Sequence, residues 1–221
     1  MTQLNLRLFT DRLGPKAEER LPGRNRVIYV HDGDAVLRAG AQAAGLAANS
    51  AWHGSGAVTV TAGAAGAALL RWELGAGEDS QTAPAGAGVA STLTLAHPVD
   101  LPELGGYLMR CDRVDFPPGG IAYTHVHRGP GIRCLLTGAI RVEVNGESRD
   151  IDPGGAWFEA GPDPVLAIAS QSAPTAFARV MILPRELRGR SSIRYVKPED
   201  AARPKLQTYR IFVDEFIELP H

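Results

Sequence analysis

The stretch PPGGIAYTHVHRGPGIRCLLTGAIRV, Pro117 to Val142, decides how the fold of this chain is interpreted. It contains two histidines, His125 and His127, separated by a single residue. Side chains alternate between the faces of a β-strand, so both imidazoles point to the same side. Two neutral imidazoles facing one interior are a usual start for a site that binds Fe, Mn, Ni, Zn or Cu. An HxH pair also occurs without a metal, so the surrounding residues decide its meaning.

The chain contains an internal repeat, and this stretch belongs to the second copy. The segment Val27–Trp52 aligns without a gap with Ile132–Trp157. In this register Gly33 aligns with Gly138, and Trp52 aligns with Trp157. Two rare anchors in one register predict two copies of the same supersecondary unit.

Within each copy, short strand-like runs alternate with turn signals. In the second copy, Asn145-Gly146 follows such a run, and Asn-Gly is a strong hairpin signal. Regular short strands of this kind predict antiparallel sandwiches or jelly rolls. We therefore predict an all-β fold of two tandem jelly-roll barrels, residues 1–96 and 97–190, followed by a C-terminal arm, residues 191–221.

The C-terminal arm differs in character from the two barrels. It combines a short helical turn near Pro198–Ala202 with two extended apolar stretches. We expect it to pack on the barrels of its own chain or to cross to a partner subunit.

Composition and charge exclude several classes of function. The chain has 25 glycines and 16 prolines with a net charge of -1, and its Lys and Arg residues are scattered. We therefore expect no nucleic-acid partner and no membrane span. No export signal is visible at the N-terminus, so a cytoplasmic location is expected, with Cys111 and Cys134 as free thiols.

At the HxH stretch the sequence resembles the cupin superfamily, whose first motif is GxxxxxHxHxxxxExxxxxxG. Gly119, His125 and His127 match that motif, and Gly138 stands at its closing glycine. A second motif, GxxxxxPxGxxHxxxN, is met in part within GESRDIDPGG, residues 146–155. Through the internal repeat, the resemblance extends to the first copy and implies a bicupin. It also implies a barrel with one divalent transition metal (Fe, Mn, Ni or Zn) in its mouth.

The departures from these motifs matter as much as the matches. The ligand Glu of the first motif falls on Gly131, and the His of the second falls near Val165. Glu159 is the replacement we predict as a third ligand or catalytic group, because the family normally has an inward apolar residue there. A buried carboxylate is costly unless it is paired or protonated. The alternative is a Glu159 bonded to loop amides or to an arginine.

Three further residues are predicted near the two histidines. Arg133 points into the barrel and offers a planar fork for a carboxylate, so it is a candidate substrate anchor. Its alternative role is a salt bridge to Glu159 or Glu143. Tyr123, two residues before His125, would share its face and donate a hydrogen bond or a proton, or it is simply structural. Trp157 is either a wall of the substrate pocket or part of the core.

The first copy lacks these chemical groups. In the repeat register, Arg20 and Pro22 stand where the second copy has its two histidines. No metal site can be built from them, so the first barrel is expected to be a scaffold or a lid.

Three functions follow from these observations. The leading hypothesis is a metal-dependent enzyme acting on a small organic acid, by dioxygenase, isomerase, lyase or decarboxylase chemistry. The second is a non-catalytic sensor or binding protein that has lost full metal coordination, and the third is a purely structural protein. The C-terminal arm and the resemblance favour a homodimer.

Overall fold

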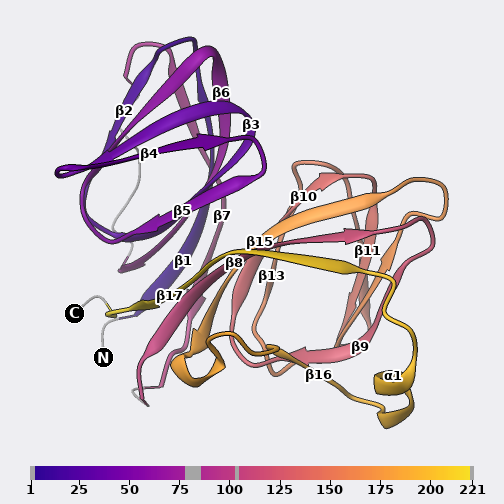
Figure 1. Cartoon of the computed structure of the whole chain (residues 1–221). Helices are drawn as coiled ribbons and strands as arrows, with labels where there is room; N and C mark the ends of the chain where they lie inside the picture. The colour runs from indigo at the N-terminus through magenta and orange to yellow at the C-terminus, as the bar shows by residue number, and fades with distance from the viewer. Residues whose placement is uncertain (1–2, 78–85, 103–104, 220–221) are drawn as a thin grey trace. The chain divides into compact units, whose positions relative to one another are not determined.

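The structure, a computed structural model, describes residues 3–77, 86–102 and 105–219. It divides into two compact units, Met1–Glu103 with Ile217–His221, and Leu104–Phe216. Almost all regular structure in both units is antiparallel β-sheet, which confirms the all-β prediction (Figure 1). None of the helices in the described ranges is long and apolar enough to cross a membrane.

The first unit is a single seven-stranded sheet, in which the longest strands pair with different neighbours along their length. Its central order is β4-β3-β6-β1-β7, with β2 paired to β6 and β5 paired to β3. The strands are β1 (Leu4–Leu13), β2 (Glu18–Leu21), β3 (Asn25–Ala39), β4 (Gln42–Ala47), β5 (Ser50–Gly54), β6 (Val58–Ala76) and β7 (Val89–Val99). The predicted boundary between residues 96 and 97 falls inside β7, which stays paired with β1 as far as Val99.

The second unit consists of two five-stranded sheets, β13-β10-β15-β8-β17 and β12-β11-β14-β9-β16. Inward apolar side chains of both sheets form a single core that includes Phe116, Leu135 and Phe177. The elements are β8 (Tyr107–Phe116), β9 (Ile121–His127), β10 (Gly131–Thr137), β11 (Ile140–Val144), β12 (Glu147–Ile151), β13 (Ala156–Glu159), β14 (Val165–Ala169), β15 (Thr175–Pro184), the 3-10 helix η1 (Arg185–Leu187), β16 (Ile193–Tyr195), α1 (Pro198–Ala202) and β17 (Thr208–Ile217).

The two units share a strand order, as the internal repeat predicts. The first half of β3 lies between β5 and β6, just as β10 lies between β13 and β15. In the first copy, β3 continues through Gly33 as a single strand, and its register against β6 shifts on either side of that residue. Gly33 and Gly138 both have positive φ, and a Cβ would lie 2.2 Å and 2.5 Å from a carbonyl oxygen. Both positions therefore require glycine.

The C-terminal arm belongs to the second unit as far as Phe216. β16 pairs with β9, the strand of the two histidines, and β17 lies beside β8. The helical turn predicted at Pro198–Ala202 is present as α1, which begins with a proline at its first position. The arm thus extends both sheets of the second unit by one strand each.

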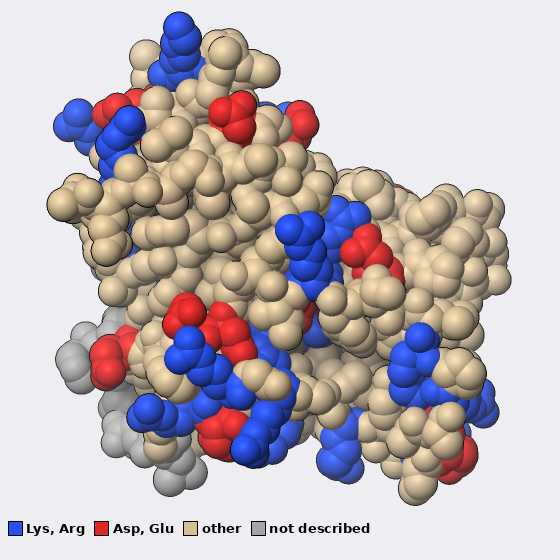
Figure 2. Space-filling model, in the orientation of Figure 1, with Lys and Arg blue, Asp and Glu red and all other residues tan. Residues whose placement is uncertain are grey.

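Charged side chains of opposite sign lie close together on the face shown in Figure 2, in line with the net charge of -1. The first unit also buries charges. Arg71 donates to Asp11 over 2.6 Å and to Glu73 over 2.7 Å, and Glu73 also accepts from Arg26. Removing one partner of such a buried pair costs about 3–5 kcal/mol, so these ions help define the interior.

Glu19 is the one acid of this buried group whose two oxygens both lack a hydrogen bond within the described ranges. Its side chain is buried, and its nearest cation is Arg71 at 3.9 Å. Burial, with a contribution from the charge of Asp11, raises the pKa of Glu19 from 4.5 to about 7. Between these two values the folded chain holds a proton that the unfolded chain has lost. Stability therefore falls as pH rises across that window.

We predict that Glu19→Gln removes this part of the pH dependence. Between pH 5 and pH 8 the wild type should lose on the order of 2 kcal/mol more unfolding free energy than the variant. Urea unfolding at the two pH values measures the difference. Glu18→Gln is the matched control, because Glu18 is an exposed neighbour paired with Arg20. Equal pH dependence in wild type and Glu19→Gln would contradict the prediction.

Candidate functional site

The two histidines of β9 point into the second unit, as the alternation of a strand predicts. The side chains of His125 and His127 are buried, with 6% and 4% of their surface exposed. Their Nε2 atoms lie 3.2 Å apart, and the rings are nearly perpendicular at 86°. Strand β16 covers the edge of β9, so the imidazoles lie in a closed interior instead of at a sheet edge.

Tyr123 does not share the face of His125, which corrects the prediction from the sequence. Between Ala122 and His125 the pairing of β9 with β14 shifts register, so three steps along β9 oppose two along β14. Such a bulge reverses the alternation of faces. Ala122 therefore packs in the core, and the ring of Tyr123 lies under the guanidinium of Arg203 at 4.7 Å.

Tyr123 still acts on the site through its backbone. Its carbonyl oxygen lies 2.7 Å from Nδ1 of His125. A carbonyl can only accept, so Nδ1 carries the proton and donates it. In the neutral ring Nε2 then presents a lone pair toward His127. This tautomer is the one that a metal-binding histidine needs.

Glu159 reaches the histidines from the neighbouring sheet. One oxygen, Oε1, accepts a 2.8 Å hydrogen bond from Nε1 of Trp157. The other, Oε2, lies 3.1 Å from Nε2 of His127 and 2.7 Å from Nη2 of Arg133. Trp157 packs edge-on against Phe177 and belongs to the core while it orients this carboxylate. Three of the residues predicted from the sequence thus meet at one carboxylate.

Arg133 has the alternative role stated for it, a salt bridge to Glu159. Its side chain is fully buried, and Nη1 donates to the carbonyl oxygen of Gly131 over 2.6 Å. Gly131 is the position where the resemblance would place a glutamate. A Cβ at Gly131 would lie 2.5 Å from the backbone carbonyl oxygen of Val180 and 3.0 Å from Nη1 of Arg133. Glycine is therefore required here by the neighbouring strand as well as by the guanidinium.

Burial and the neighbouring charges determine the protonation of the site. Burial lowers the pKa of His127 to about 3, despite its contact with Glu159, and it lowers the pKa of His125 as well. Burial would raise the pKa of Glu159, but Arg133 and then His127 lower it overall. The site at neutral pH therefore holds two neutral imidazoles, one carboxylate and one guanidinium.

Two consecutive distances between donor atoms in the site resemble those between neighbouring ligands of a metal ion. Neighbouring ligands at right angles around an ion with bonds of about 2.1 Å are about 3 Å apart, close to the 3.2 Å and 3.1 Å measured between consecutive donors. In the described ranges, however, no group of three or more His, Cys, Asp or Glu side chains is arranged to hold a metal. Arg133 engages the remaining oxygen of Glu159. The two imidazoles could ligate an ion, and Glu159 would be a third ligand only if its Oε2 were released from Arg133.

The space in front of these groups is small. The cavity has a volume of about 20 Å³, room for one water-sized body. Its walls include Phe116 and Phe177 of the core, together with two residues that were not singled out from the sequence, Arg179 and Tyr209. Arg179 could have been found by the argument used for Arg133, as an inward charge in an apolar strand. Tyr209 comes from the arm, and no local pattern places it here.

The first unit has no counterpart to the two histidines. In the second unit, His125 pairs with Val165 of β14, which pairs with the end of β11. In the first unit, the equivalent position is that of Leu21, which pairs with Val58 of β6 beside the end of β3. The sequence alignment put Arg20 there, one residue away, because the bulge in β9 has no equivalent in β2. Leu21 is a buried core residue.

Solved structures of other proteins share this fold. A deletion variant of oxalate decarboxylase from Bacillus subtilis matches with a TM-score of 0.68 at 12% identity, over 90% of this chain and 73% of that chain. AerE from Microcystis aeruginosa matches at 0.58 and 12%, over 82% and 93%. A salicylate 1,2-dioxygenase variant from Pseudoaminobacter salicylatoxidans matches at 0.53 and 11%, over 95% and 74%.

The likeness lies in structure and not in sequence. No protein-family model matches this chain. No curated protein matches it in sequence either. At 11–12% identity, the structural matches establish the architecture alone. The chain has a cupin-like, antiparallel jelly-roll fold.

Proposed function

We propose that the second unit is a metal-dependent enzyme of the cupin superfamily acting on a small organic acid. One observation carries the proposal: Nε2 of His125, Nε2 of His127 and Oε2 of Glu159 follow one another at 3.2 Å and 3.1 Å in a closed interior. Two imidazoles and a carboxylate are a common ligand set for Fe(II) and related divalent ions. Such an ion supplies a Lewis acid that polarises a carboxylate or carbonyl oxygen.

The residues around the ligands have distinct positioning roles in this proposal. The carbonyl of Tyr123 keeps the proton of His125 on Nδ1 and leaves Nε2 free. Trp157 holds one oxygen of Glu159, which directs the other toward the histidines. Arg133 balances the charge of Glu159, and in doing so competes with the metal for that oxygen.

The substrate class rests on two supports. Oxalate decarboxylase and salicylate 1,2-dioxygenase, which share the fold, are named for small carboxylic acids. The interior of this chain also contains the buried guanidinium of Arg179, a group that suits carboxylate recognition. Decarboxylation, dioxygenation, isomerisation and lyase chemistry all fit a metal that polarises an acid.

A second function is favoured by the ion pair between Arg133 and Glu159. With that carboxylate neutralised, two imidazoles remain, and the cavity has room for one water-sized body. A non-catalytic binding protein or sensor needs no third ligand. Metal content separates the two functions.

We predict that protein purified without chelator carries about one divalent transition metal per chain, and that the variants His125→Ala and His127→Ala carry little. Elemental analysis by mass spectrometry, alongside circular dichroism to verify folding, measures this. His53→Ala in the first unit is the control, because it changes a histidine far along the chain from the site. A wild-type content below about 0.1 per chain would end the enzyme proposal.

We also predict opposite effects from the two partners of the buried ion pair. Glu159→Gln should weaken metal binding by about tenfold or more, because it removes the charged donor. Arg133→Met should strengthen it, because the carboxylate loses its competing cation. Competition with a fluorescent chelator measures both affinities. Unchanged affinity in Glu159→Gln would show that Glu159 is not a ligand.

A further inference from the structure

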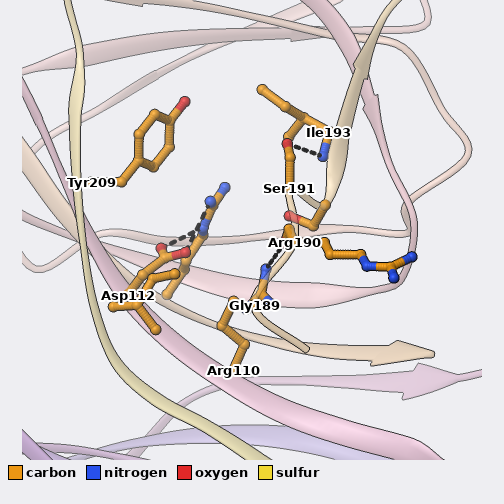
Figure 3. Close-up of a pocket in the computed structure, with 10 residues that line it drawn as sticks. Arg110, Asp112, Gly189, Arg190, Ser191, Ile193 and Tyr209 are labelled. Atoms are coloured by element: carbon orange, nitrogen blue, oxygen red, sulfur yellow. Dashed lines mark hydrogen bonds and ion pairs between the residues drawn. The ribbon is translucent and has the colours of Figure 1, made fainter. Parts of the chain in front are cut away.

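A larger cavity lies beside the histidine site. It has a volume of about 260 Å³ and is bounded by β8 and β15 on one side and by the arm on the other. Figure 3 shows Tyr209 facing Ser191 and Ile193 across this space, with Asp112 at its base. Arg179 and Tyr209 line both this cavity and the small one in front of the histidines. The two spaces therefore share a wall.

Arg179 has a free donor at this shared wall. Its side chain is 5% exposed, and Nε and Nη2 form a fork with the two oxygens of Asp112 at 2.7 Å and 3.1 Å. Nη1 has no hydrogen-bond partner among residues 3–77, 86–102 and 105–219. Burial alone would lower the pKa of Arg179, but the charge and hydrogen bonds of Asp112 raise it overall, and the fork fixes the guanidinium in position. An oriented N–H donor without a protein acceptor can anchor a ligand oxygen.

The first unit provides an internal comparison. Strand pairing places Arg71 at the position equivalent to Arg179, since Ile28 pairs with Arg71 as Arg133 pairs with Arg179. All three nitrogens of the Arg71 guanidinium are used, by Asp11, Glu73 and Ser91. The same arginine is thus saturated in one unit and has a free Nη1 in the other.

The other walls of the pocket are largely apolar and suit an apolar part of a ligand. Ile193, Ile211 and the ring of Tyr209 are apolar, and Ile211 is 51% exposed although it lies in a strand. A dry cavity of about 150 Å³ accepts benzene, so this space can hold a ring together with a carboxylate. The nearby Arg110 adds no free donor, because its nitrogens already bind Asp214 and backbone carbonyls.

We propose that this pocket binds a small carboxylic acid with an aromatic or branched apolar body, its carboxylate on Nη1 of Arg179. The apolar body lies against Ile193, Ile211 and Tyr209, and the carboxylate is at the wall shared with the histidine cavity. The inference deepens the proposed function by naming where the acid binds. It assigns the anchor to Arg179 in place of Arg133, which pairs with Glu159 and is not among the residues that line this pocket.

Calorimetric titration of chelator-treated, metal-free protein with benzoate, benzamide and oxalate tests the pocket. Benzoate should bind, while benzamide, which lacks the charge, and oxalate, which lacks the apolar body, should bind at least about tenfold more weakly. Arg179→Lys keeps the charge beside Asp112 but removes the fork, and should weaken benzoate by about tenfold or more. Arg71→Lys is the matched control and should bind benzoate as the wild type does.

A second variant covers the case in which Arg179→Lys fails to fold. Ile211→Trp fills the pocket from an exposed position and should abolish benzoate binding. Wild-type protein that does not bind benzoate, or benzoate affinity unchanged in Arg179→Lys or in Ile211→Trp, would overturn the proposal. His125→Ala separates this test from that of the metal site, because it should lose metal and retain benzoate binding.

Discussion

The negative charge of Glu159 is the constraint around which the interior of the second unit is built. A carboxylate buried in an apolar barrel is stable only if donors surround it. Here Trp157 supplies one N–H, Arg133 supplies a full positive charge, and His127 lies within 3.1 Å. Each of these contacts limits what the neighbouring group can do. Arg133 is held against Glu159, and Nε2 of His127 lies between Oε2 of Glu159 and Nε2 of His125.

The buried charges are balanced in pairs across adjacent strands of one sheet. Asp112 neutralises Arg179, and Glu159 neutralises Arg133, while the two arginines stand directly opposite one another in the β10 and β15 register. Two guanidinium groups side by side repel unless each has its own carboxylate. The two pairs differ in their surroundings. Arg133 pairs with Glu159 and the carbonyl of Gly131, whereas Arg179 lines two cavities.

The two units solve the same packing problem with different chemistry. In the first, Arg71 pairs with the carboxylates of Asp11 and Glu73, and Leu21, part of the apolar core, stands at the position of the first histidine. In the second, β9 carries a bulge and two histidines, and the arm adds Tyr209 at the rim. One fold thus holds a buried ion cluster in one copy and a pair of buried imidazoles beside an ion pair in the other.

The sequence by itself determined the architecture and the pair of histidines. Period-two patterning, turn residues and the repeat are local signals, and they predicted the antiparallel strands, the paired glycines Gly33 and Gly138, the turn of α1 and the inward direction of His125 and His127. These signals also indicated that Glu159, Trp157 and Arg133 share one interior. Local alternation holds along an uninterrupted strand, and these residues lie on such strands.

Tertiary structure alone decided which of these groups bind one another. The bulge in β9 turned Tyr123 away from the site, because one extra residue reverses every side chain before it. The choice of Glu159 as the partner of Arg133, and of Asp112 as the partner of Arg179, depends on strand register across the sheet, which no pattern within one strand encodes. Tyr209 reaches the rim only because a strand distant in sequence pairs beside β8, and chain topology is a property of the whole fold.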